Sequence, residues 1–163
     1  MKIFFSLLLL LSVAANQLQA QPVTIKRDSF SLKYPAGWTI DTEDEDYDPD
    51  ALFSLDSPDD ENMIMFMIGI PMEADDLLKA QVEAFTTDFI KKAEVTSFDT
   101  WGKYKGKGKL LKGKLLGLFN GFVRIFIYTD DYKTMMVVEQ CYDKAYQTLE
   151  KDYELIRSSF TFH

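Results

Sequence analysis

Residues 63 to 70 restrict the fold more than any other segment, because Met63 to Ile70 is apolar at every position. A half-buried strand alternates apolar and polar side chains, whereas a strand covered on both faces is apolar throughout. The run is too short for a transmembrane helix, which needs about 20 residues, and Pro71 ends it. The segment therefore predicts the central strand of a sheet with further layers on both sides.

Shorter segments with strand-like patterns lie before and after this run, and turn signals separate them. Pro35-Ala36-Gly37 joins two of them, so we expect a hairpin over residues 30 to 40. Strands joined by hairpins form antiparallel sheets, and we expect residues 134 to 142 to pair with residues 122 to 128 across a turn at Asp130 and Asp131. The expected strands are Phe30 to Tyr34, Trp38 to Ile40, Leu52 to Leu55, Val95 to Trp101, Tyr104 to Leu116, Phe122 to Tyr128 and Thr134 to Tyr142.

Two segments have helical periodicity instead. Residues 75 to 92 repeat apolar side chains at helical spacing, with acids at the start and lysines at the end, as the helix dipole favours. A second helix is expected after Asp143, with an apolar stripe of Tyr146, Leu149, Tyr153 and Ile156. Such stripes must be buried against a sheet. The predicted fold class is a single α+β domain, with a twisted antiparallel sheet flanked by helices.

Two segments near the ends of this domain carry a family resemblance. The first is Phe30-Ser31-Leu32-Lys33-Tyr34-Pro35-Ala36-Gly37-Trp38, and the second is Ile156-Arg157-Ser158-Ser159-Phe160. Over residues 30 to 163 the chain resembles the PsbP/Mog1-like superfamily, which includes small exported bacterial proteins. The resemblance implies an α/β/α sandwich and a non-enzymatic role in binding or assembly support. No binding residue of that family can be matched to a position in this sequence.

The first twenty residues have the order of a secretory signal peptide. Lys2 precedes an apolar run from Ile3 to Val13, and a short polar stretch then ends at Ala20. We expect cleavage after Ala20, with Ala15 as the alternative, so that residues 21 to 163 form the domain. A membrane anchor is the alternative interpretation, but the run is short for one. The prediction is a periplasmic or secreted protein with no transmembrane segment after cleavage.

The charge of the protein is −8 and is unevenly distributed. Residues 41 to 61 hold eleven acids and no base, whereas residues 103 to 114 hold six lysines and no acid. An acidic protein repels phosphate backbones, so we do not expect nucleic acid as a partner. The predicted partner is an unknown protein or a small anionic ligand of the envelope, and we expect the protein to be a monomer.

Cysteine and histidine each occur once, as Cys141 and His163. An intramolecular disulfide is therefore impossible, and a nucleophile activated by histidine would depend on the last residue of the sequence. Cys141 lies among apolar residues, which favours a buried structural thiol. These counts favour a protein that is not an enzyme and has no cofactor, with calcium as the one exception considered below.

The lysines at alternate positions suggest a partner-binding surface. Lys103, Lys105, Lys107 and Lys109 would share one face of a strand, with Tyr104 and two glycines on the other. Such a face could bind an anionic partner, and the glycines could let a ligand approach the backbone. The alternative is an edge strand whose solvated lysines prevent strand addition.

The acidic loop suggests a metal site. Asp44, Asp46, Asp48 and Asp50 alternate, and carboxylates spaced in this way can converge on calcium. The loop does not match an EF-hand, which would need glycine where Pro49 stands. A solvated acidic loop is the alternative.

Three functions from different classes remain open at this point. The first is an exported non-enzymatic binding or assembly-support protein. The second is a carrier for calcium or a small ligand that uses the loop of residues 41 to 61. The third is a hydrolase with paired carboxylates, which a cavity holding two carboxylates of unequal pKa would favour.

Overall fold

The computed structural model describes residues 21–130 and 133–163. A seven-stranded antiparallel sheet dominates it, with the strand order β3-β4-β5-β9-β8-β7-β6. Its strands are β3 (Thr39–Ile40), β4 (Leu52–Asp56), β5 (Met63–Ile68), β6 (Ile90–Trp101), β7 (Tyr104–Leu115), β8 (Phe119–Thr129) and β9 (Thr134–Tyr142). The expected α+β class is confirmed. The proposed signal peptide, residues 1 to 20, lies outside the described residues.

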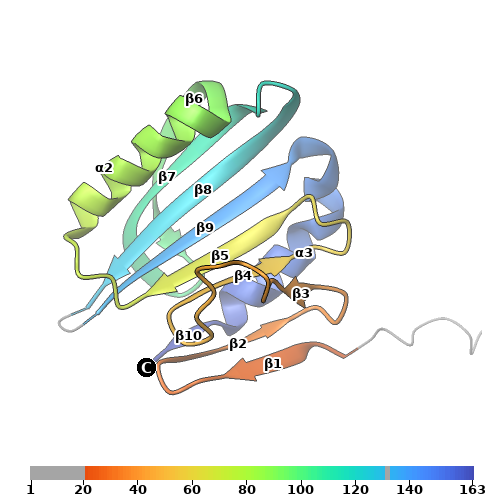
Figure 1. Ribbon diagram of the computed structural model, residues 1–163, viewed down its shortest axis with the longest axis vertical. Helices are drawn as coiled ribbons and strands as arrows, with labels where there is room; N and C mark the ends of the chain where they lie inside the picture. Colours follow the sequence, from red (N-terminus) through yellow and green to blue (C-terminus); the bar gives the residue numbers. More distant parts are fainter. Residues whose placement is uncertain (1–20, 131–132) are drawn as a thin grey trace, which may run out of the picture.

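The two helices cover opposite faces of this sheet (Figure 1). Helix α2 (Ala74–Ala84) packs on β7 and β8, and α3 (Asp143–Ser159) packs on the other face. The predicted stripe of α3 is confirmed, with Leu149, Tyr153 and Ile156 buried. Along β9, Met136 and Val138 face the α2 core, while Val137 faces the α3 core. The layers are therefore helix, sheet and helix. Neither helix of residues 21–130 and 133–163 is long and apolar enough to span a bilayer.

A second, small sheet closes the α3 side. It contains β1 (Val23–Lys26), β2 (Phe30–Tyr34) and β10 (Thr161–Phe162), with β2 in the middle. The predicted hairpin over residues 30 to 40 is therefore wrong, because β2 pairs with β1 and β10 while β3 pairs with β4. Trp38 causes the separation, since its ring is buried edge-on against Tyr153 of α3.

The helix expected over residues 75 to 92 ends earlier. Helix α2 stops at Ala84, a π-helical turn η1 (Phe85–Phe89) follows, and β6 starts at Ile90. Ile90 pairs with Leu115 and is fully buried. Burial of this side chain in the sheet outweighs the helical periodicity, so Lys91 and Lys92 lie on a strand.

Strand β5 lies inside the sheet, as predicted, but only one of its faces is fully buried. Ile64 and Phe66 pack against the α3 core, whereas Met63, Met65 and Met67 on the α2 face are half-buried. Helix α2 lies over β7 and β8 and leaves the β4 and β5 part of that face partly open.

Candidate anion-binding site

A row of paired residues crosses the sheet on the face that α3 covers. It runs from Thr96 of β6 through Leu110, Arg124 and Glu139 to Ile64 of β5. Directly paired residues of antiparallel strands place their side chains side by side on the same face. Arg124 and Glu139 are the single charged residues of β8 and β9. The register therefore brings these two charges together inside an apolar surface.

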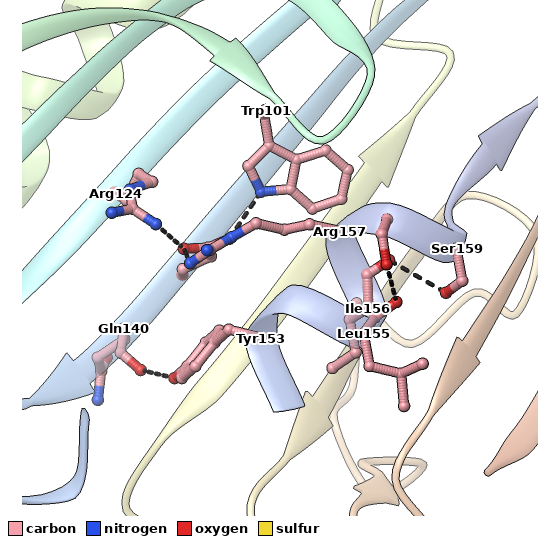
Figure 2. A network of polar contacts seen from close by, with 10 residues as sticks. Trp101, Arg124, Gln140, Tyr153, Leu155, Ile156, Arg157 and Ser159 are labelled. Atoms are coloured by element: carbon pink, nitrogen blue, oxygen red, sulfur yellow. Dashed lines mark hydrogen bonds and ion pairs between the residues drawn. The ribbon is translucent and has the colours of Figure 1, made fainter. Parts of the chain in front are cut away.

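The Glu139 side chain is completely buried, and four N–H groups surround its carboxylate. Oε1 accepts hydrogen bonds from Trp101 Nε1 and Arg157 Nε, both at 2.6 Å. Oε2 accepts from Arg157 Nη2 at 2.7 Å and from Arg124 Nη1 at 2.8 Å. Figure 2 shows these donors converging from β6, β8 and α3. A buried carboxylate is tolerated only when its oxygens are hydrogen-bonded, and this one is saturated.

Arg157 is the principal counter-ion of Glu139. It lies near the end of α3 and grips both carboxylate oxygens, the bidentate geometry that makes arginine–carboxylate pairs strong. Burial by itself lowers the pKa of Arg157, but its hydrogen bond to Glu139 and the charge of that residue raise it more. Arg157 therefore stays charged, and its charge by itself is enough to neutralise Glu139.

Arg124 adds a positive charge that the buried carboxylate does not need. It donates one hydrogen bond to Glu139, and that is its only acceptor among the described residues. Its guanidinium carbon lies 5.7 Å from the ring centroid of Phe98 and 5.5 Å from that of Phe122. These cation–π contacts hold the group in place, and its side chain remains 22% exposed. Two arginines facing one glutamate leave a net charge of about +1.

An open cavity of about 410 Å³ lies against this surplus charge. Arg124 and Arg157 form its charged part, and Thr96, Thr100 and Gly102 contribute polar atoms from β6 and the turn after it. Phe98 and Leu110 make the apolar part of the lining. The free N–H groups of Arg124 can donate to an entering carboxylate, and the low polarity of the surroundings strengthens that pairing.

The glycines of the Lys/Gly segment serve packing. A Cβ atom at Gly108 would overlap the ring of Phe98, which lies across the backbone of β7. An aromatic ring that covers a glycine in a neighbouring strand stabilises the sheet at that point. The space that we assigned to a ligand is therefore filled by Phe98, which in turn carries the Arg124 guanidinium.

The four lysines of the predicted binding surface share one face only in part. Lys107 and Lys109 pair with Ile127 and Ile125 of the α2 core and lie on that face, as predicted, whereas Lys103 precedes β7. Lys107 is 2.6 Å from Asp75 of α2, and Lys109 donates to Ser97 of β6. Lys103 turns toward the other side and donates to Thr161 of β10, while Lys105 is exposed. The edge-strand alternative is wrong as well, because β7 lies between β6 and β8. A binding role for these lysines stays a prediction.

Tyr104, the aromatic residue assigned to that surface, is half-buried and connects the two sheets. Its hydroxyl accepts a hydrogen bond from the Phe162 amide at 2.7 Å, and its ring lies 4.8 Å from that of Tyr128. These contacts within the protein explain the position of Tyr104, and no binding partner is needed to explain it.

The four aspartates of the acidic loop also separate. Asp44 and Asp48 accept hydrogen bonds from the amides of Asp46 and Asp50, which shapes the loop. Asp44 and Asp46 border a cavity above the β5 methionines, whereas Asp50 lies 3.7 Å from Arg27. Within residues 21–130 and 133–163, no three acidic, histidine or cysteine side chains are grouped closely enough to hold a metal. Calcium binding here stays a prediction.

The cavity beside the loop has an acidic rim and an apolar floor. It measures about 330 Å³, and Met63, Met65 and Met67 line it together with Asp41 and Asp56. Burial raises the pKa of Asp56, and the nearby charges of Asp41 and Asp60 raise it further. This cavity groups carboxylates as the paired-carboxylate alternative requires.

Cys141 and His163 are the residues that nucleophilic catalysis would need, and the structure gives both of them contacts that serve the fold. Cys141 is fully buried, as predicted, and burial raises the pKa of its thiol to about 11. His163 is held better than a terminal residue would suggest, because its amide donates to the Ser29 carbonyl and its Nε2 lies 3.3 Å from Ser31 Oγ. Among the described residues no carboxylate orients this imidazole, which a catalytic serine–histidine pair requires.

The arginine–glutamate network was missed by sequence reasoning, although a signal was present. The pairing of residues 122–128 with residues 134–142 is predicted and confirmed, and each strand contains a single charge of opposite sign. Opposite single charges on paired apolar strands indicate a buried cross-strand ion pair. The contributions of Arg157 and Trp101 depend on tertiary packing and left no such signal.

Comparison with known proteins identifies the fold. No protein-family model and no curated protein matches the sequence. LpqN of Mycobacterium tuberculosis, a protein involved in cell envelope biogenesis, is 11% identical with a TM-score of 0.52, over 86% of this chain and 90% of that one. These values show a shared fold and nothing more.

Two further solved structures align with most of this chain. Cyanobacterial PsbP from Synechocystis sp. PCC 6803 is 15% identical over 91% of this chain and 96% of its own, with a TM-score of 0.49. The Ran-binding protein Mog1p of Saccharomyces cerevisiae is 11% identical over 87% of this chain and 95% of its own, also with a TM-score of 0.49. The structure that carries the comparison is LpqN, and the fold shared with it is of the expected α+β class.

Proposed function

We propose that this protein is an exported, non-enzymatic binding or assembly-support protein of the cell envelope, and that it holds an acidic group of a partner protein against Arg124. Export follows from the signal-peptide pattern of residues 1 to 20. The envelope role of LpqN, which shares the fold, is consistent with this location. Fold likeness alone does not carry the proposal.

The surplus charge of Arg124 is the observation that supports the proposal. A network built for stability would pair one arginine with one glutamate, and Arg157 already binds both oxygens of Glu139. The second arginine adds a desolvation cost, and it faces a cavity that the protein's own side chains leave open. A carboxylate from a partner would complete its pairing. Aspartate, glutamate and the terminal carboxylate of a polypeptide carry the required group.

Photo-crosslinking in the native host tests this proposal. A photoreactive side chain at Thr96, which is exposed at the rim of the cavity, should capture a discrete protein adduct. The Arg124→Met change in the same protein should abolish that adduct, and Lys105→Met should not. A photoreactive side chain at Lys79, exposed on α2, is the matched control. Identical adducts from both positions, or an adduct that survives Arg124→Met, would rule out the cavity as the binding site.

A calcium carrier is a second candidate, because four carboxylates border the cavity above the methionines, although no three of them in the described residues are grouped closely enough to hold a metal without moving. The charge of Asp41 contributes to the raised pKa of Asp56, and a bound cation would relieve this repulsion. Saturable calcium binding that Asp46→Ala removes would favour the carrier. The same cavity is where a paired-carboxylate hydrolase would act, so glycoside cleavage that Asp56→Asn abolishes would favour that third function.

A further inference from the structure

The turn between β7 and β8 exposes three large apolar side chains within four positions. Leu116 is 61% exposed, Leu118 69% and Phe119 59%. They are the three most exposed large apolar residues among those the structure describes. The hairpin forms a tip of the sheet, far from the C-terminus of the protein (Figure 1). Single exposed apolar residues are ordinary, but a concentration of them marks an interaction surface.

The backbone of the turn holds these side chains outward. Leu116 and Gly117 both have positive φ, 51° and 73°. Glycine adopts this conformation freely, whereas leucine does so at a cost. The Leu116 amide donates to the Phe89 carbonyl at 2.7 Å, and the Leu118 amide donates to the Leu115 carbonyl at 3.0 Å. The turn is therefore a defined structure that presents leucine where a polar residue would be ordinary.

Lysines surround the apolar tip. Lys112 and Lys114 precede it on β7, and Lys91 lies opposite Lys114 on β6. Lys114 and Lys144 line a hollow of about 590 Å³ together with Leu118 and Phe119. Glu61 and Asp143 border the same hollow, and Glu94 pairs with Lys112. The segment from residue 112 to residue 119 contains no acid, although the protein as a whole has a charge of −8.

We propose that this tip, residues 116 to 119, inserts into the surface of an anionic lipid bilayer. The neighbouring lysines, Lys91, Lys112, Lys114 and Lys144, would face the lipid headgroups. Leucine and phenylalanine would enter the boundary between headgroups and acyl chains, and the lysines would remain at the headgroups. The tip is only four residues long, whereas a stable protein interface needs roughly 800 Å² on each partner. The acidic remainder of the protein would be repelled, which orients the tip toward the membrane.

Insertion at the tip leaves the Arg124 cavity accessible. Strand β7 runs from the turn beside the cavity to the tip, and Leu110, which lines the cavity, precedes Leu115 by five residues. At about 3.3 Å per residue, this distance is roughly 16 Å. The proposal is independent of the proposed function, because neither site shares a residue with the other.

Vesicle binding tests the insertion. The protein recovered from the cell envelope, with its N-terminus determined by mass, is sedimented with vesicles of phosphatidylcholine containing 30% phosphatidylglycerol (roughly the charge of a bacterial membrane) or none. We expect binding to the anionic vesicles that weakens with added salt. Leu118→Ser with Phe119→Ser should reduce the partition coefficient at least about tenfold. Lys112→Gln with Lys114→Gln should reduce it on anionic vesicles only.

Two controls distinguish insertion of the tip from general stickiness of the protein and from binding by charge alone. Met72→Ser removes an exposed apolar side chain outside the tip, 48% exposed, and should leave vesicle binding unchanged. In Phe119→Trp, lipids brominated along the acyl chain should quench the new fluorescence. Absence of binding to either vesicle, or binding that the tip changes leave intact, would overturn the proposal. It would equally fail if residue 118 crosslinks to an envelope protein while vesicles are not bound.

Discussion

Glu139 and Leu118 are both exceptions to the usual rule that polar side chains are exposed and apolar side chains are buried. The charged residue is completely buried, and the apolar residue is 69% exposed. Each placement is costly in a monomer. The difference is in how the cost is offset, because Glu139 finds four donors within the fold, whereas Leu118 is left mostly in water.

This contrast separates structural requirements from functional ones. A buried charge whose hydrogen bonds are complete belongs to the fold, and its removal should damage stability. An exposed apolar tip contributes little to stability, so its removal should damage only an interaction. Arg124 lies between the two, since one of its N–H groups belongs to the network and the others face a cavity.

The largest effect is expected from Glu139→Gln. The change leaves two half-buried arginines without a counter-charge and should lower the free energy of unfolding by about 3–5 kcal/mol. Urea unfolding followed by circular dichroism measures the loss. Glu154→Gln, on the exposed side of the same helix that carries Arg157, is the control and should stay within about 0.5 kcal/mol of the original protein. A small loss of unfolding free energy in Glu139→Gln would contradict the comparison between Glu139 and Leu118.

Arg124→Met should have an intermediate effect. Glu139 keeps Arg157 and Trp101, so only one charged hydrogen bond is lost, at a cost of about 1.5–3 kcal/mol. The cavity should also lose its affinity for carboxylates, which a titration with succinate followed by NMR would detect. If Arg124→Met is as damaging as Glu139→Gln, the second arginine is a structural requirement and its charge is not surplus.

Leu118→Ser with Phe119→Ser should change stability little, by about 0.5 kcal/mol or less, because both side chains are mostly in water. Thermal unfolding of the double variant beside the original protein checks this. A loss of several kcal/mol would mean that the tip packs against the protein in solution, and the contrast with Glu139 would then disappear.

The smallest effect is expected from Asp56→Asn, which tests burial of a carboxylate without donors. No side chain in the described part of the protein donates to Asp56, and burial followed by the charges of Asp41 and Asp60 raises its pKa from 3.8. The folded protein then binds this proton more tightly than the unfolded polypeptide. The ionised Asp56 carboxylate therefore lowers the stability of the fold. This loss of stability is complete above the raised pKa and disappears as the pH falls toward 3.8.

Asp56→Asn should accordingly raise the melting temperature at pH 7 by about 1 °C, since solvent screening keeps the effect small. The difference between the two proteins should vanish near pH 4 in scanning calorimetry. A variant that is less stable than the original protein at pH 7 would show that Asp56 has donors, as Glu139 does.

Much of the fold could be predicted from local patterns. The inward residues of α3 and the pairing of β8 with β9 follow from side-chain periodicity and turn residues, both of which act over a few positions. The helix of residues 75 to 92 and the hairpin of residues 30 to 40 were wrong where a distant contact decided the outcome. Ile90 is buried against β7, and Trp38 against α3.

The candidate site shows the same division. The sequence by itself determined that Arg124 and Glu139 are isolated opposite charges on paired apolar strands. Only the tertiary structure decided that Arg157 would neutralise Glu139, that Phe98 would cover Gly108, and that the surplus charge would face a cavity. Periodicity records which face of an element is buried, but not what it is buried against. That second choice is made by contacts between residues far apart in the sequence, where the network of Glu139 is formed.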